Sequence, residues 1–262
     1  MTSNASVTFV GNATTLLRLG GFTLLTDPAF GAAGSRVHLG YGAWTRRLLD
    51  PAMTYAELPS PDAVLLSHLH GDHFDRAARR VLPRDLPIVT TAQAQRRLRR
   101  RSFSDVRGLP TWDAEEWRRD GELLRITALP GRHGPGLVDR LLPDVMGSLV
   151  EWEVAGERRL RLYITGDTLY RPFLGEIRER CGEPDVMLIH LGGTKLLGLT
   201  LTMDGRQGAE LTGLIRPRLT LPIHYDDYSV MKSPLGDFLT ECQVRSLTGV
   251  QALGRGETLK LA

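Results

Sequence analysis

The sequence predicts a mixed α/β fold with a metal site at its centre, and three observations support this prediction. Short apolar runs typical of strands alternate with segments of helical periodicity along most of the 262 residues. No Ser/Gly/Pro-rich linker, low-complexity tract or fixed-period repeat interrupts them, so we expect a single domain over residues 1–262. A dense polar cluster, His68-Leu69-His70-Gly71-Asp72-His73, follows an apolar run at residues 64–66. Such a concentration of ionisable groups does not suit a hydrophobic core and predicts metal binding instead.

The chain is expected to begin with three antiparallel strands. Residues 7–10, 14–19 and 22–26 have strand-like composition, and the turn signals Gly11-Asn12 and Gly20-Gly21 separate them. Asp27 then lies at the end of the third strand. Two interpretations of Asp27 are open: it supports a metal-binding histidine through a hydrogen bond, or it only shapes the Asp-Pro turn.

Residues 29–59 show no clear periodicity and are rich in glycine. The segment carries the aromatic side chains of Phe30, His38, Tyr41 and Trp44. A long loop of this kind is either a lid or pocket wall that governs substrate selectivity, or a segment that its aromatic residues anchor to the body of the protein.

The spacing of the polar cluster predicts two adjacent metal ions. Alternate residues of an extended segment point the same way, so His68 and His70 are expected to bind one cation. Gly71 lets the chain turn and directs Asp72 and His73 toward a second position. A helix cap is an alternative for Asp72, but it does not explain three neighbouring histidines.

The rest of the chain continues the alternation of helices and strands. Helices are predicted over residues 74–81, 92–101, 173–180 and 204–215. Strands are predicted over residues 87–90, 122–129, 148–154, 159–165, 185–189 and 218–221.

Three polar residues follow these strands, where an α/β fold places its active site. His133, Asp167 and His224 each come shortly after a predicted strand. Singly each signal is weak, because an Asp after Gly is usually a turn residue. Together they are expected to supply the further ligands that two metals require.

His190 ends the apolar run at residues 185–189 and precedes Gly192-Gly193. It is a candidate catalytic residue, together with Asp72, because its imidazole can bind substrate or donate a proton to a leaving group. The alternative is a structural histidine that is hydrogen-bonded to backbone at a strand end.

Composition limits the classes of partner and compartment. The net charge is only +3, and the basic run Arg96–Arg101 is interpreted as the solvated face of a short helix, so nucleic acid is disfavoured as a partner and a small-molecule substrate is expected. The stretch Met1–Ser6 lacks the character of a secretion signal, and no apolar run reaches the roughly 20 residues needed to span a bilayer. With two unpaired cysteines, these features predict a cytoplasmic protein without a disulfide framework or membrane span. The oligomeric state stays open.

The sequence resembles the metallo-β-lactamase superfamily. It contains the HxHxDH signature at residues 68–73, then a His, a Gly-Asp-Thr turn at residues 166–168 and a final His224-Tyr225. Within the superfamily it is similar to the branch of ascorbate-6-phosphate lactonase and the N-acyl phosphatidylethanolamine phospholipase D type hydrolases, through Gly-Asn-Ala-Thr at 11–14, Thr-Asp-Pro at 26–28, Gly-Gly at 192–193 and Thr-Met at 202–203. Two positions depart from that branch: Asn12 replaces a His, and His190 stands where Pro is common.

The resemblance implies a four-layer αβ/βα sandwich and a complete ligand set. It implies that one metal is held by His68, His70 and His133, that Asp167 bridges, and that the second metal is held by Asp72, His73 and His224. Zinc is favoured by the ligand types, with manganese and iron as alternatives.

The expected function is that of a dinuclear metal-dependent hydrolase. A metal-bridging hydroxide would attack an ester, lactone or phosphodiester bond. The alternatives are a nucleic-acid phosphodiesterase and a metal-binding protein without catalytic activity.

Overall fold

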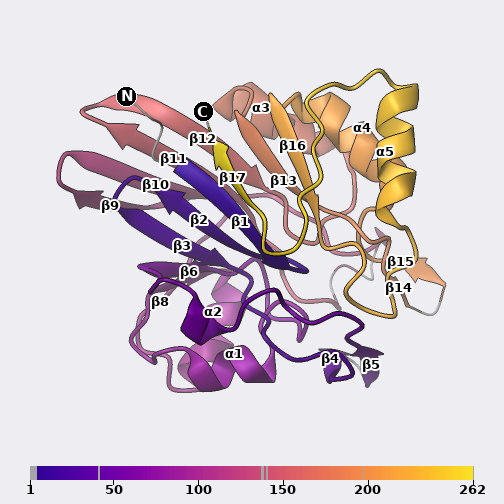
Figure 1. Ribbon diagram of the computed structural model, residues 1–262, viewed down its shortest axis with the longest axis horizontal. Helices are drawn as coiled ribbons and strands as arrows, with labels where there is room; N and C mark the ends of the chain where they lie inside the picture. Colours follow the sequence, from indigo (N-terminus) through magenta and orange to yellow (C-terminus); the bar gives the residue numbers. More distant parts are fainter. Residues whose placement is uncertain (1–4, 41, 137–138, 140, 197, 262) are drawn as a thin grey trace.

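Two β-sheets stack face to face, and helices cover the outer face of each (Figure 1). The computed structural model describes residues 5–40, 42–136, 139, 141–196 and 198–261. Tyr41 and the first four residues, on which sequence-based expectations were placed, lie outside this range. The predicted α/β class and the four-layer αβ/βα arrangement are confirmed.

The first sheet contains the amino-terminal strands and the strand that leads into the histidine cluster. The β2–β3 hairpin pairs Leu19 with Phe22 across Gly20-Gly21, as predicted. β3 and β6 run parallel, so their carboxyl ends lie at one edge. The order in the sheet is β17 (Thr258–Leu261), β1 (Ala5–Gly11), β2 (Thr14–Leu19), β3 (Phe22–Thr26), β6 (Ala63–Leu65), β7 (Ile88–Thr90) and β8 (Val106–Gly108).

The second sheet delivers the later candidate ligands. Its first four strands along the chain are antiparallel neighbours, whereas β12, β13 and β16 run parallel to one another. The order in the sheet is β16 (Leu219–Ile223), β13 (Val186–His190), β12 (Glu157–Ile164), β11 (Gly147–Val154), β10 (Glu122–Leu129) and β9 (Ala114–Arg119).

Apolar side chains on both faces of the strands create three packed layers. Leu24 faces the inner core between the sheets, while its neighbour Leu25 packs on the helical side, as the two-residue period of a strand requires. The first sheet is covered by α1 (Arg76–Val81) and α2 (Ala92–Arg99). The second is covered by α3 (Gly175–Cys181), α4 (Gly205–Ile215) and α5 (Leu235–Val244).

Side-chain caps fix the start of the helix beside the histidine cluster. The carboxylate of Asp75 accepts a hydrogen bond from the backbone N of Ala78 at 2.7 Å and begins α1. The cap of this helix is therefore Asp75, and Asp72 is left for another role.

The segment at residues 29–59 is more regular than its sequence suggested. It contains a hairpin formed by β4 (Arg36–Gly40) and β5 (Ala43–Arg46). Arg47 anchors the segment: it is fully buried, donates to the backbone O of Ala29 at 2.8 Å and pairs with Asp227 at 3.4 Å. Trp44 is not an anchor, because 61% of its surface is exposed.

Several short or weakly patterned elements were not predicted. They are β4, β5, β8, β9, β17, α5 and the small hairpin of β14 (Lys195–Leu196) and β15 (Leu199–Thr200). Among the helices in the described part of the chain, none is long and apolar enough to span a bilayer.

The close approach of α4 and α5 generates a stability prediction. A Cβ added to Gly205 would lie 2.5 Å from the backbone N of Phe238, so Gly205→Ala must push α5 away. Overpacking of this kind costs about 1–3 kcal/mol, and the melting temperature should fall by about 2–10 °C. Gly236→Ala, whose Cβ would meet open space in α5, is the control and should not lower it. Equal melting temperatures in thermal unfolding would contradict the packing described.

Candidate metal centre

Strand ends from both sheets meet at one place and bring the polar residues together. The histidine cluster follows β6, His133 follows β10, Asp167 follows β12 and His224 follows β16. β10 runs in the same direction as β12, because both are antiparallel to β11. The seven residues predicted as metal ligands therefore lie at the same edge, and all of them are buried.

Three imidazoles form the first group of candidate ligands. His68 Nε2 lies 3.0 Å from His70 Nδ1, which lies 3.2 Å from His133 Nε2. Ligand atoms on a tetrahedral zinc at about 2.0–2.1 Å would be separated by roughly 3.3 Å. The spacing of these nitrogens therefore fits one metal ion.

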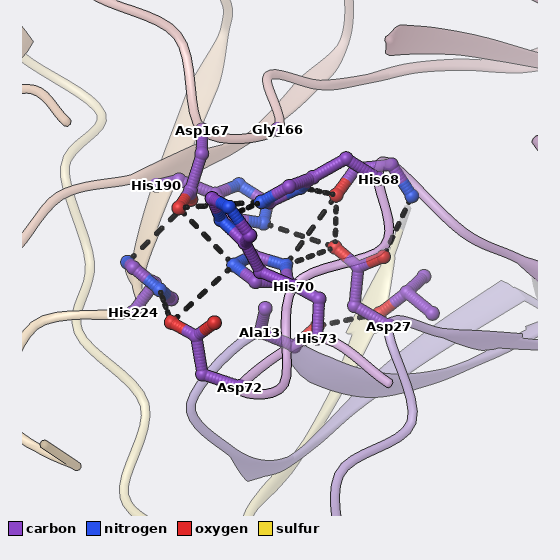
Figure 2. Close-up of polar contacts among 12 residues, drawn as sticks. Ala13, Asp27, His68, His70, Asp72, His73, Gly166, Asp167, His190 and His224 are labelled. Carbon is purple, nitrogen blue, oxygen red and sulfur yellow. Dashed lines mark hydrogen bonds and ion pairs between the residues drawn. The ribbon is translucent and has the colours of Figure 1, made fainter. Parts of the chain in front are cut away.

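Two carboxylates and two imidazoles form the second group. His224 Nε2 lies 3.4 Å from Asp72 Oδ2, and His73 Nε2 lies 3.2 Å from Asp167 Oδ2. Figure 2 shows Asp72 and Asp167 approaching His224 from two sides. One ligand atom from each of the four residues lies within 4.8 Å of the others, so this group can also hold a cation.

Asp167 connects the two groups. Its Oδ2 lies 3.2 Å from His73 Nε2 and 3.9 Å from His68 Nε2. The turn that presents it depends on Gly166, which has φ of 62° and whose added Cβ would lie 2.9 Å from the backbone O of Met146.

Outward hydrogen bonds leave the inward nitrogens free to bind a metal. His133 Nδ1 donates to the backbone O of Leu201 at 3.1 Å, and His224 Nδ1 donates to the backbone O of Leu191 at 3.2 Å. A neutral imidazole with its proton on the outward nitrogen has a lone pair on the inward one.

Burial and charge set the protonation of the first group. Burial lowers the pKa of His68 well below its usual value and the pKa of His70 to about 3, and it also lowers the pKa of His133. These three imidazoles are therefore neutral near pH 7, which is the form that binds metal.

The second group contains buried atoms that lack partners. Asp72 Oδ1 and Asp167 Oδ1 are buried and have no hydrogen-bond partner among the described residues, while His73 Nε2 forms ion-pair contacts with Asp167 and Asp72. Burial opposes a charge on His73, yet Asp167, Asp72 and Asp27 raise its pKa well above the usual value. This concentration of negative charge fits divalent cations, which would satisfy the same atoms.

Asp27 lies behind His73 and holds its orientation. Its Oδ2 accepts from His73 Nδ1 at 3.0 Å and from Ser67 Oγ at 2.8 Å, and its Oδ1 accepts from the backbone N of Ser67 at 2.7 Å. Although burial would raise the pKa of Asp27, His73 and His190 lower it to about 2, so it is ionised.

His190 also lies behind the candidate ligands. It is fully buried, and its ring stacks on that of His73 with centroids 5.9 Å apart and planes at 14°. Its Nδ1 lies 3.2 Å from Thr165 Oγ1 and its Nε2 lies 3.5 Å from Asp27 Oδ2. These contacts favour a positioning role over contact with substrate.

Sequence reasoning did not assign a role to Asn12, which joins two ligand segments. Its Nδ2 donates to the backbone O of Asp72 at 2.8 Å, and its backbone O accepts from the backbone N of His224 at 2.9 Å. The positive φ of 54° explains why the Gly11-Asn12 turn carries Asn. The departure from the family pattern at this position was the only signal in the sequence.

The chain is similar to known metal-dependent hydrolases. Its sequence matches the family described as Beta-lactamase superfamily domain over residues 23–225. A UPF0173 metal-dependent hydrolase of Archaeoglobus fulgidus is 24% identical over 210 residues, which are 76% of this chain and 84% of that protein. N-acyl-phosphatidylethanolamine-hydrolyzing phospholipase D 1 of Caenorhabditis elegans is 26% identical over 238 residues, which are 86% of this chain and 65% of that protein. The resemblance drawn from the sequence is confirmed.

Partial coverage and low sequence identity limit what these relatives show about this chain. The chain spans less than two thirds of some curated relatives that it matches. It covers 65% of the phospholipase and 62% of an uncharacterized Mycobacterium tuberculosis protein. The crystal structure of isothiocyanate hydrolase from Delia radicum gut bacteria aligns with a TM-score of 0.80 at 20% identity, over 98% of this chain and 99% of that chain. At such identity the likeness shows the fold alone.

The contacts of Asp27 predict a loss of metal affinity in Asp27→Asn. Asn tolerates the positive φ of 35° at this position, but its amide nitrogen cannot accept the proton of His73 Nδ1. Loss of such a partner lowers metal affinity by about 10–100-fold, to be measured by competition with a chromophoric chelator. Asp75→Ala, which removes the cap of α1, should lower the melting temperature while metal affinity stays unchanged. The same loss of affinity in both variants would contradict the role of Asp27.

The position of His190 predicts a different outcome for His190→Gln. Because the side chain contacts Thr165 and Asp27, we expect a weaker hold on metal and an unchanged pH profile of turnover. The catalytic interpretation instead requires a fall in turnover of roughly 100-fold or more with both metals retained. Metal content and the pH–rate profile of the variant distinguish the two.

Proposed function

Because the chain belongs to the beta-lactamase superfamily, we propose that it hydrolyses an ester, lactone or phosphodiester bond of a small molecule with two divalent metal ions. One observation carries this proposal: Asp167 lies within 3.9 Å of His68 and within 3.2 Å of His73, and therefore reaches both candidate metal positions. A carboxylate shared between two positions is suited to keep two cations adjacent.

The chemistry expected of the bound ions is the activation of water. Two adjacent divalent cations lower the pKa of a shared water toward about 7 and stabilise negative charge on the attacked oxygen. The chain's contribution is to hold the ligands in place: Asp27 orients His73, and Leu201 orients His133 through its backbone O. All seven candidate ligands are buried, which limits the contact of their side chains with bulk water.

A protein nucleophile is not needed in this proposal. Cys181 and Cys242 lie in α3 and α5, away from the candidate ligands in the sequence and fold. Asp72 is best suited to bind metal, because its carboxylate faces His73 and His224.

The donor set supports zinc as the metal. Imidazole nitrogens supply all of the first group and half of the second, and zinc prefers nitrogen donors together with carboxylates. Manganese and iron accept the same donors and are the alternatives. A protein that only binds metal is distinguished by intact metal content without turnover of any lactone, ester or phosphodiester.

The bridging position predicts the behaviour of Asp167→Ala. The variant should keep the metal of the three-histidine group, lose most of the other and lose at least about 100-fold in turnover. Metal content after desalting and hydrolysis of a generic lactone and a generic phosphodiester are the measurements. Asp185→Ala is the control, since this carboxylate accepts from the backbone N of Arg161 at the opposite end of β13. Normal metal content in Asp167→Ala would contradict the bridging role.

A further inference from the structure

A cavity of about 960 Å³ opens beside the first group of candidate ligands. Its wall includes His70, the β4–β5 hairpin and residues of α1 and α2. Figure 1 shows the two helices and the hairpin at one end of the molecule, below the first sheet in that view. A volume of this size is in the range of pockets that hold small molecules. The segment at residues 29–59 therefore contributes a pocket wall.

Five arginines line this cavity, and they come from separate elements. Arg36 lies in β4, Arg76 and Arg79 lie in α1, Arg97 lies in α2 and Arg101 follows it. The cavity thus contains five positive side chains, although the whole chain carries a net charge of only +3. The arginines of residues 96–101 are exposed, as the solvated-face interpretation predicts, and two of them, Arg97 and Arg101, also line the cavity.

The five guanidinium groups lack acidic partners. Within the described ranges of the chain, no carboxylate lies within 4.0 Å of any of them. Among the described residues of the lining, Asp75 is the only acid, and its two oxygens accept from the backbone N of Ala78 and of Gly31. Burial and the neighbouring charges of Arg79 and Arg97 lower the pKa of Arg101.

Part of the wall is apolar. Trp44 is 61% exposed and Leu141 is 62% exposed, and both line the cavity together with Leu142 and Pro143. Apolar side chains grouped at a pocket offer a surface on which the apolar part of a ligand can pack. The lining therefore suits a molecule with an apolar part and a negatively charged group.

We propose that the cavity binds a phosphate group of the substrate through Arg36, Arg76, Arg79, Arg97 and Arg101. The proposal rests on the proposed function, because His70 links the cavity to the candidate metal centre. The phosphate held here is separate from the bond that is cleaved, and it orients the substrate. Several guanidinium groups suit a phosphate, which has three terminal oxygens and a double charge, better than they suit a carboxylate.

The shape of the cavity favours a small phosphate ester over larger polyanions. Single-stranded nucleic acids bind along extended grooves that follow the backbone. Here the arginines line a single cavity beside His70 that is partly open to solvent. A lipid headgroup presents the same phosphate chemistry and is tested as a separate source.

The test is equilibrium binding of phenylphosphonate to the zinc-loaded full chain by calorimetry. The double variant Arg97→Gln/Arg101→Gln should weaken binding by about 10-fold or more, because each charge-assisted contact contributes to affinity. Arg36→Gln, in another element, should weaken it about 3-fold or more. Benzoate should bind more weakly than phenylphosphonate to the unsubstituted protein.

The matched control is Arg96→Gln/Arg100→Gln. It removes the same charge from the same helix region, but neither residue lines the cavity. Its affinity should stay within about 2-fold of the original value. Equal losses in both double variants, or unchanged binding in Arg97→Gln/Arg101→Gln, would overturn the proposal, the latter because the phosphonate would then bind only at the metals.

Two further measurements distinguish a small phosphate ester from a lipid or nucleic acid, and distinguish phosphate binding from the proposed hydrolysis. Binding to phosphatidylcholine vesicles with 20% phosphatidic acid, or to a single-stranded oligonucleotide, but not to phenylphosphonate would overturn the small-molecule proposal. Arginine-dependent binding by a protein that hydrolyses no lactone, ester or phosphodiester would keep this inference and reject the proposed function.

Discussion

The balance of charge at the point where the two sheets meet is the constraint on which the rest of the structure depends. Asp27, Asp72 and Asp167 are each at most 4% exposed and lie among buried imidazoles. Buried carboxylates are costly unless cations and hydrogen bonds compensate them. Without metal, protonation of His73 compensates part of this negative charge, since the surrounding carboxylates raise the pKa of His73. Divalent cations would compensate the negative charge more completely and would bind the buried carboxylate oxygens that lack a hydrogen-bond partner.

The fold serves this constraint by bringing distant segments to one edge. Parallel strands in each sheet end at the same side, so short turns after them are enough to present the ligands. Contacts behind the ligands then fix their orientation: Asp27 holds His73, and Asn12 ties the segment of Asp72 to that of His224. The arginine-lined cavity lies on the other side of His70, so the proposed chemistry and the proposed recognition share one wall.

The candidate metal ligands could be predicted from the sequence because their signals are local in the chain. The density of residues 68–73 and the position of His133, Asp167 and His224 after apolar runs were sufficient to predict which side chains would meet, and the structure brings all seven together. The roles of Asn12 and of the five arginines depend on contacts between segments far apart in the chain. The hairpin at residues 36–46 was missed because its strands are only five and four residues long, which is too short for the alternation in Arg36–Gly40 to stand out within a glycine-rich segment.

The central claim is that two cations occupy the two groups of ligands. The most direct measurement is anomalous X-ray diffraction at the zinc edge from crystals of the zinc-loaded protein. Two anomalous peaks per chain are expected, one among His68, His70 and His133 and the other among Asp72, His73 and His224, with Asp167 beside both. A single peak, or a peak outside these two groups, would contradict the claim.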